Sequence, residues 1–258
     1  MVLSGRLQGE YLPQYIVPFL IDKEEAIQKF MEWIHQKKFV SRNFFNKKQI
    51  EKVSGIYFPY WIYDCQTNAA LKAHATKVKV WKTGDYEYTE TQTYQIFRSG
   101  ILRFSDLMKN ALKKADLKLA DGVLPFEMKK QKKFSMSYLS GFLAEKRDIE
   151  EKEIMPEIRQ EIDQYAQSLL RETIHGYSTV TVESFQQNVD MEHLHYALFP
   201  VWILTYPGKN GKTYYYAMNG QTGKVCGVLP INWKKVLLVA GIIGIALFSL
   251  TLVIGGFL

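Results

Sequence analysis

The clearest pattern of apolar and polar positions lies at the C-terminal end of the chain. From Val236 to Leu258 no side chain is charged, and the only polar ones are one serine and one threonine. A helix rises about 1.5 Å per residue, so this stretch would span roughly 34 Å, against about 30 Å for the hydrocarbon core of a membrane. Three residues typical of a membrane interface directly precede it: Trp233, Lys234 and Lys235. We therefore expect a transmembrane helix over 236–258 and a juxtamembrane linker over 229–235.

The charges beside this stretch predict its orientation. The two lysines lie on its N-terminal side, and basic residues favour the cytoplasmic side of a membrane. The start of the chain, from Met1 to Arg6, lacks the apolar region of a signal peptide. These features predict a single-pass, tail-anchored protein of the cell membrane, with residues 1–228 forming a cytosolic domain.

The first part of the chain predicts one helix followed by strands. Asp22 and Glu25 have the spacing of a capping box, and the apolar positions that follow recur with helical spacing until about Lys37. From residue 56 the sequence is rich in aromatic and β-branched residues. We expect strands over 56–63 and 69–81, and a hairpin turn over 82–85 that leads into a strand over 86–97.

The middle of the chain predicts helices and the last part predicts strands again. The helices are expected over 105–114, 137–146 and 150–173, and the strands over 178–185, 193–206, 213–218 and 224–228. This order favours an α+β fold of antiparallel β units, at about 54–104 and 176–228, separated by a helical insert at about 105–175. The segment 58–62, Phe-Pro-Tyr-Trp-Ile, recurs as Phe-Pro-Val-Trp-Ile at 199–203, which favours an internal duplication over coincidence.

The charge balance suits an anionic partner without identifying it. The net charge is +7, and the main basic run consists of Lys129, Lys130, Lys132 and Lys133. We consider three interpretations of this run, in order of preference: a solvated loop, contact with anionic lipid, and contact with nucleic acid.

Residues that carry chemistry are sparse. His193 and His195 alternate onto one face of an expected strand, but a metal ion needs further ligands, and no local pattern supplies them. Cys65 and Cys226 are the only cysteines, and in a reducing compartment two distant cysteines are free thiols. We therefore expect a protein that is not an enzyme, with no catalytic residue, no metal ligand and no cofactor.

Three segments resemble a known family. They are 18–23, Pro-Phe-Leu-Ile-Asp-Lys; 55–64, which begins Gly-Ile-Tyr-Phe-Pro; and 138–146, which begins Tyr-Leu-Ser-Gly-Phe. Together they resemble the bacterial TFIIB-type zinc-ribbon-containing membrane proteins, often labelled primosomal protein N′-like, a family that includes YdjG-type proteins. That family usually starts with cysteine pairs that bind zinc, and this chain has none. The resemblance therefore implies a fragment, a truncated gene model or a variant without the ribbon, and it assigns no zinc ligand here.

Three classes of function follow from these observations. The first is a scaffold or adaptor that binds protein partners in a membrane-associated complex beside the lipids, and the resemblance implies a link to membrane stress. The second is a nucleic-acid-binding module that uses basic and aromatic side chains on strands, which we rank lower. The third is a metal-dependent enzyme built around His193 and His195.

Overall fold

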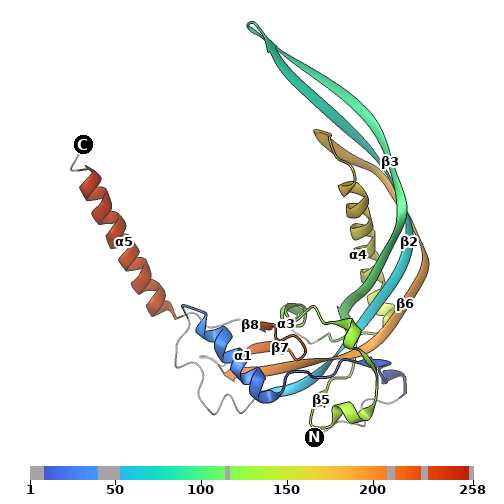
Figure 1. Ribbon diagram of the computed structural model, residues 1–258, viewed down its shortest axis with the longest axis vertical. Coiled ribbons are helices and arrows are strands. Elements are labelled where there is room, and N and C mark those ends of the chain that lie inside the picture. The colour runs from blue at the N-terminus through green and yellow to red at the C-terminus, as the bar shows by residue number, and fades with distance from the viewer. Residues whose placement is uncertain (1–8, 40–52, 114–116, 208–212, 228–231, 256–258) are drawn as a thin grey trace. The chain divides into compact units, whose positions relative to one another are not determined.

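The chain forms two compact units. The computed structural model describes all residues except 1–8, 40–52, 114–116, 208–212, 228–231 and 256–258. The first unit contains residues 1–58, 114–146 and 198–258, and the second contains 59–113 and 147–197. Figure 1 shows the helices and strands of both units. Each unit has its own buried cluster.

Long antiparallel strands dominate the fold. The longest are β2 (Ser54–Thr83), β3 (Tyr86–Asn110) and β6 (Thr179–Pro207). In the described part of the chain, eight strands are hydrogen-bonded together, with a main order of β3-β2-β6-β1-β4. Both β2 and β6 contribute residues to each unit.

The first unit is built around α1 (Lys23–His35) and the last third of β6. Its short strands are β1 (Tyr15–Ile16), β4 (Lys132–Lys133), β5 (Leu143–Ala144), β7 (Thr213–Asn219) and β8 (Val225–Gly227). Its other helical segments are η2 (Gly9–Tyr11), α3 (Leu117–Gly122), η4 (Met128–Lys130), η5 (Met136–Leu139) and α5 (Trp233–Gly255). The buried side of α1, with Ala26, Phe30 and Ile34, packs against Trp202 and Met218 on β6 and β7.

The second unit is a three-stranded sheet covered on one face by α4 (Glu151–Glu172). The hairpin of β2 and β3 turns at Gly84 and Asp85, and Gly84 adopts a φ of +62°. Successive side chains of a strand point to opposite faces, so alternate β2 residues such as Leu71 and Ala73 face the helix. They form one buried cluster with Ala166 and Leu170 of α4.

Several predicted elements are confirmed. The carboxylate of Asp22 accepts a hydrogen bond of 2.8 Å from the backbone N–H of Glu25, which caps α1 as the spacing predicts. The hairpin turn and the long helix over 150–173 are also present, the latter as α4. The internal duplication stays a prediction, although each copy of the repeated segment lies in a long strand that leads into an antiparallel partner.

Two short helices were predicted wrongly. Residues 105–110 continue β3 instead of starting a helix, and Asp106 adopts a φ of 58° there. Its backbone N–H donates to the side chain of Asp64 at 2.8 Å, across an irregularity in the pairing of β2 and β3. Residues 137–146 form the end of η5 and the strand β5, with Gly141 at a φ of +84°.

The predicted membrane anchor is also wrong. In the part of the chain that the structure describes, no helix is both long enough and apolar enough to cross a membrane. The tail anchor, the single-pass topology and the cell-membrane location are corrected with it.

Candidate functional site

A large concave site lies within the first unit. It is a pocket of about 1040 Å³, lined by residues from three segments, 18–23, 53–57 and 137–143, and by Trp202. These segments are the turn before α1, the start of β2, and the η5–β5 connection. Residues far apart in the sequence therefore form one surface.

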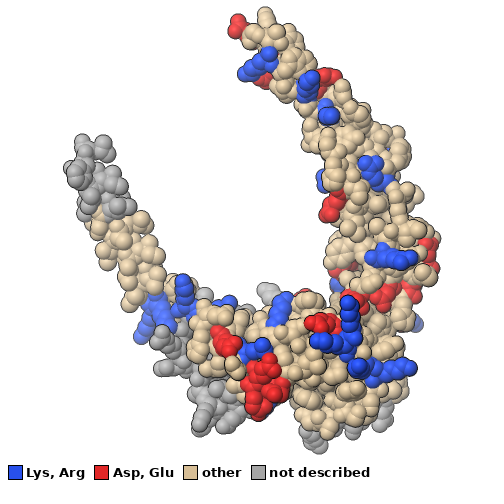
Figure 2. Space-filling model, viewed as in Figure 1, with Lys and Arg blue, Asp and Glu red and all other residues tan. Residues whose placement is uncertain are grey.

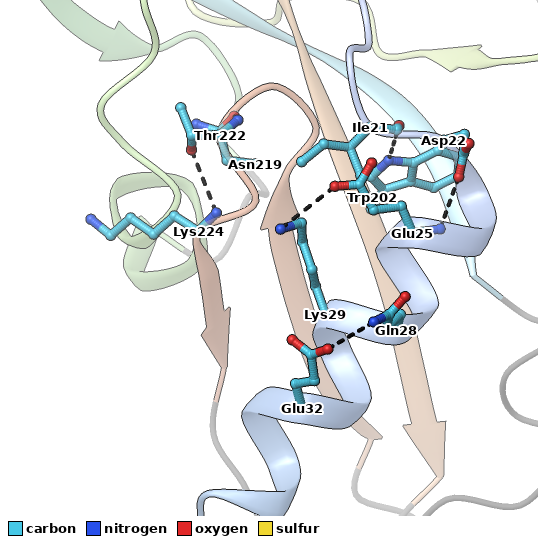
Figure 3. Close-up of polar contacts among 10 residues, drawn as sticks. All are labelled: Ile21, Asp22, Glu25, Gln28, Lys29, Glu32, Trp202, Asn219, Thr222 and Lys224. Atoms are coloured by element: carbon cyan, nitrogen blue, oxygen red, sulfur yellow. Dashed lines mark hydrogen bonds and ion pairs between the residues drawn. The ribbon is translucent and has the colours of Figure 1, made fainter.

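Backbone and indole hydrogen bonds hold the first segment in place. The N–H groups of Leu20 and Ile21 both donate to the carbonyl of Gly220 at 3.0 Å. The indole Nε1 of Trp202 donates to the carbonyl of Ile21 at 3.0 Å, and the Asp22 cap follows directly (Figure 3). The wall of the pocket is thus fixed to β6 and to the turn after β7.

The third segment is fixed to the start of β2. Ile56 pairs with Leu143 and Tyr57 with Ala144 in a short parallel ladder. The N–H of Glu145 then donates to the carbonyl of Tyr57 at 2.9 Å. These bonds place the ring of Phe142 beside the rings of the other two segments.

Four aromatic rings form the floor of the pocket. Phe19 stacks on Phe142 with ring centroids 4.2 Å apart and an angle of 9° between the planes. The same Phe19 ring lies 5.0 Å from Tyr57 and 4.9 Å from Trp202, both in tilted or edge-on geometry. Such pairs contribute beyond their burial, because the positive edge of one ring meets the negative face of another.

Two glycines allow these rings to come so close. A Cβ atom at Gly55 would lie 2.6 Å from Cδ1 of Phe142 and 3.1 Å from Trp202. A Cβ atom at Gly220 would lie 2.6 Å from two ring atoms of Phe19. Any side chain at either position would push a ring of the floor out of its place.

The rim of the pocket combines exposed apolar side chains with hydroxyl groups. Leu20 is 51% exposed and Leu143 is 38% exposed. The polar groups of the lining include the hydroxyls of Ser54, Ser137 and Ser140. Burial raises the pKa of Tyr57 to about 12, so its hydroxyl stays protonated at neutral pH. Aromatic rings with exposed leucines at the rim are suited to holding an apolar group.

A second group of polar side chains lies on the long strands of the second unit. The rings of His193 and His195 stack 5.2 Å apart, as expected for residues that alternate onto one strand face. Burial lowers the pKa of His195, while the nearby carboxylates of Asp64 and Asp106 act to raise it. Burial and the charge of Asp64 in turn raise the pKa of Asp106.

The structure gives this polar group no metal-binding geometry. Among the residues described, no three His, Cys, Asp or Glu side chains are arranged to hold a metal ion. Tyr63 instead donates a hydrogen bond of 2.7 Å to Glu192, and the guanidinium of Arg159 lies 3.4 Å from the same carboxylate. The first contact joins β2 to β6 and the second joins α4 to the sheet, so both have a structural role.

The residues singled out for lipid contact are exposed but do not form one site with the pocket. Lys129, Lys130, Lys132 and Lys133 lie on η4 and β4, and Lys130 pairs with Glu127 at 3.0 Å. Trp233, Lys234 and Lys235 open α5, where Trp233 is 67% exposed. Basic and acidic side chains are interspersed over the face shown in Figure 2.

The pocket itself was not predicted from the sequence, although a signal for it was present. The three segments that carry the family resemblance, 18–23, 55–64 and 138–146, supply 13 of its 17 lining residues. Their shared spatial location explains why aromatic residues and glycines recur in segments that carry no catalytic pattern.

Comparison with known proteins finds one informative relative. The chain is 32% identical over 259 residues to the uncharacterised protein YdjG of Bacillus subtilis (strain 168), and the match covers 99% of this chain and 76% of that protein. No family model matches the chain, so the TFIIB-type zinc-ribbon and primosomal attribution stays a prediction. No solved structure matches it either.

Proposed function

We propose that this chain, which belongs to the family of the Bacillus subtilis protein YdjG, is a non-enzymatic scaffold that binds a partner protein through the pocket of its first unit. The observation that carries the proposal is the convergence of three distant segments on one aromatic floor. Stacked rings, close-packed glycines and a backbone hydrogen-bonded on two sides make the pocket preformed. A preformed site loses little conformational entropy on binding.

The composition of the pocket favours an apolar side chain of a protein as its occupant. Protein interfaces gain most of their affinity from a few aromatic or aliphatic anchors that fill well-packed pockets. The aromatic floor would receive such an anchor, and the serine hydroxyls of the rim could accept or donate hydrogen bonds to the flanking peptide. The exposed side chains of Leu20 and Leu143 would be covered in the complex.

The proposal can be tested by photo-crosslinking with the full chain in cells that make it naturally. Leu143 is replaced by p-benzoyl-phenylalanine, and the matched control carries the same amino acid at Leu12, which is 48% exposed in the same unit but does not line the pocket. We expect a discrete protein adduct at position 143 that is absent at position 12. Adding Leu20→Arg should abolish it, because a guanidinium on the rim would have to be desolvated.

Two results would contradict the proposal. One is the same adduct pattern at positions 143 and 12, which would mean that crosslinking is nonspecific. The other is an adduct with the mass of a small molecule, which would make the pocket a ligand site instead. Protein adducts would be identified by mass spectrometry.

The nucleic-acid alternative has its own test. The exposed lysines of η4 and β4 would bind phosphates, and such binding weakens steeply as salt is added because counterions are released. A titration of the purified protein with single- and double-stranded DNA and RNA at low salt should show no saturable binding if the scaffold proposal is right.

A further inference from the structure

The long strand β3 has an open edge. It lies at one end of the strand order and pairs with β2, and among the described residues no strand lies on its other side. Its outer edge therefore presents a row of backbone N–H and C=O groups over Tyr86–Asn110. Typical strands have about five or six residues, so an open edge of this length is unusual.

Part of the usual protection against edge pairing is missing over most of this strand. Natural edge strands are shortened, bulged, or carry proline or charged side chains, lysine above all, which discourages another strand from adding. Residues 86–104 contain neither proline nor lysine. From Gln66↔Arg103 to Thr83↔Tyr86 the pairing of β2 with β3 also runs without a register shift, so no bulge interrupts the edge.

The sequence of β3 is complementary to itself when a second copy is laid antiparallel along this edge. A two-fold axis normal to the sheet keeps each side chain on its own face of the sheet. Even-numbered residues of one copy therefore lie opposite even-numbered residues of the other, and odd-numbered opposite odd-numbered. With the axis at Tyr94, Glu90 comes opposite Arg98 of the second copy, and by symmetry Arg98 comes opposite its Glu90. At the end of the hairpin, Asp85 comes opposite Arg103.

Neighbouring registers lack this match. An axis at Thr93 puts Glu90 opposite Ile96 and leaves no opposite charges facing each other. With the axis at Gln95, the only oppositely charged residues that face each other are Glu87 and Arg103. Opposite charges directly across a strand pair are favourable, so the charges select the Tyr94 register.

The same register places the exposed aromatic residues of the hairpin opposite residues that they can cover. Tyr88 is 47% exposed and comes opposite Gly100, a position where an aromatic ring can cover the missing side chain. Tyr86 is 73% exposed and comes opposite Leu102. Beside Leu102 lies Phe104, whose ring is stacked 6.5 Å from that of Tyr165 on α4. The end of the hairpin of one copy would thus lie beside α4 of the other copy, where its exposed tyrosines would be covered.

We propose that β3 is a homodimer interface, in which two copies of the chain pair antiparallel along this edge with Tyr94 on the two-fold axis. All the residues involved lie in the second unit, so this proposal is independent of the pocket in the first unit. A partner strand from another protein is the alternative occupant, and the experiment separates the two.

Charge reversal tests the register. Sedimentation equilibrium of the full chain should show a dimer. Glu90→Arg puts like charges opposite Arg98, and Arg98→Glu puts like charges opposite Glu90, so each variant should raise the dissociation constant tenfold or more. The swapped double variant, Glu90→Arg with Arg98→Glu, should recover a dissociation constant near that of the wild type.

Disulfide crosslinking tests the axis. Tyr94→Cys places two thiols directly across the strand pair, within the Cα separation that a disulfide requires. Under mild oxidation it should give a covalent dimer, while the control Thr89→Cys on the same strand should not, because its two copies would lie roughly 34 Å apart. Circular dichroism would check that both variants are folded.

Three outcomes would overturn the proposal. A wild-type chain that stays monomeric at about 100 µM has no such interface. A dimer that neither charge variant weakens, and that Tyr94→Cys does not crosslink, uses a different surface. Crosslinking of Tyr94→Cys to another protein instead of to itself would assign the edge to a heterologous partner.

Discussion

At the scale of single residues, the glycines of the pocket make the sharpest prediction. Gly55→Ala puts a Cβ atom 2.6 Å from Phe142, so the ring must move and its stacking on Phe19 is lost. Forcing an extra carbon into a packed cluster typically costs about 1–3 kcal/mol. We expect a loss of that size in the free energy of unfolding, measured by urea denaturation.

The matched control is Gly100→Ala on β3. A Cβ atom there would have no atom within 4 Å. At a protein concentration where the chain is monomeric, the substitution should therefore leave the free energy of unfolding unchanged or raise it slightly, since alanine restricts the unfolded chain more than glycine does. Equal losses for both variants would show that Gly55 has no special packing role.

His195 makes a prediction about pH. Burial lowers its pKa, so the unfolded chain binds a proton before the folded chain does as pH falls through the ordinary value of 6.5. His193 acts in the same direction, and Asp64 and Asp106 oppose it. The free energy of unfolding should therefore decrease below pH 6.5, until the folded protein binds the proton as well.

The variant His195→Asn removes this titration. Its free energy of unfolding should change less than that of the wild type between about pH 7.5 and about pH 5.5, whatever its stability at neutral pH. Identical slopes for wild type and His195→Asn would contradict the prediction.

At the scale of elements, α4 offers two adjacent leucines with opposite surroundings. Leu170 is 5% exposed and belongs to the buried cluster under the helix, whereas Leu169 is 45% exposed. Leu170→Ala should lower the free energy of unfolding by about 2–5 kcal/mol because it leaves a cavity. Leu169→Ala should change the free energy of unfolding by about 0.5 kcal/mol or less, measured at a protein concentration where the chain is monomeric. Urea denaturation of both variants measures the difference.

The elements that the sequence predicts are those whose signals are local. The Asp22 cap and the helical spacing of α1 and α4 act between residues a few positions apart, so both helices are predicted close to their observed bounds. Ser105 and Asp106 imitate a helix start, but Asp106 lies at an irregularity of the β2–β3 ladder and bonds to the distant Asp64. That outcome depends on a residue on another strand.

The candidate site depends even more on distant residues. Tyr57 lies in a predicted strand, Phe142 in a segment wrongly predicted as a helix, and Phe19 shortly before the helix that Asp22 opens, but no local rule states that their rings meet. The contact requires the parallel pairing of β5 with β2 and the absence of side chains at Gly55 and Gly220. The sequence could therefore supply the segments of the pocket and not their assembly.

At the scale of the whole molecule, the two compact units should respond separately to local damage. Each has its own buried cluster, one around α1 and one under α4. Leu170→Ala should therefore speed amide hydrogen exchange in 59–113 and 147–197 while leaving that of α1 near the wild-type rate. Mass spectrometry of peptic fragments measures both regions at once. An equal acceleration throughout the chain would mean that the molecule opens as a single cooperative unit.

The positions of the two free cysteines have a practical consequence. Cys65 lies in the second unit, where its side chain is buried and burial raises the pKa of its thiol. Cys226 lies in the first unit, packed so closely against the backbone of Gly122 that a Cβ atom there would overlap its sulfur. Cys226 is only partly buried, so an alkylating reagent should reach its thiol more readily than that of Cys65, which becomes accessible when the second unit opens. The labelling rate of Cys65 would therefore measure how often the second unit opens, without any engineered probe.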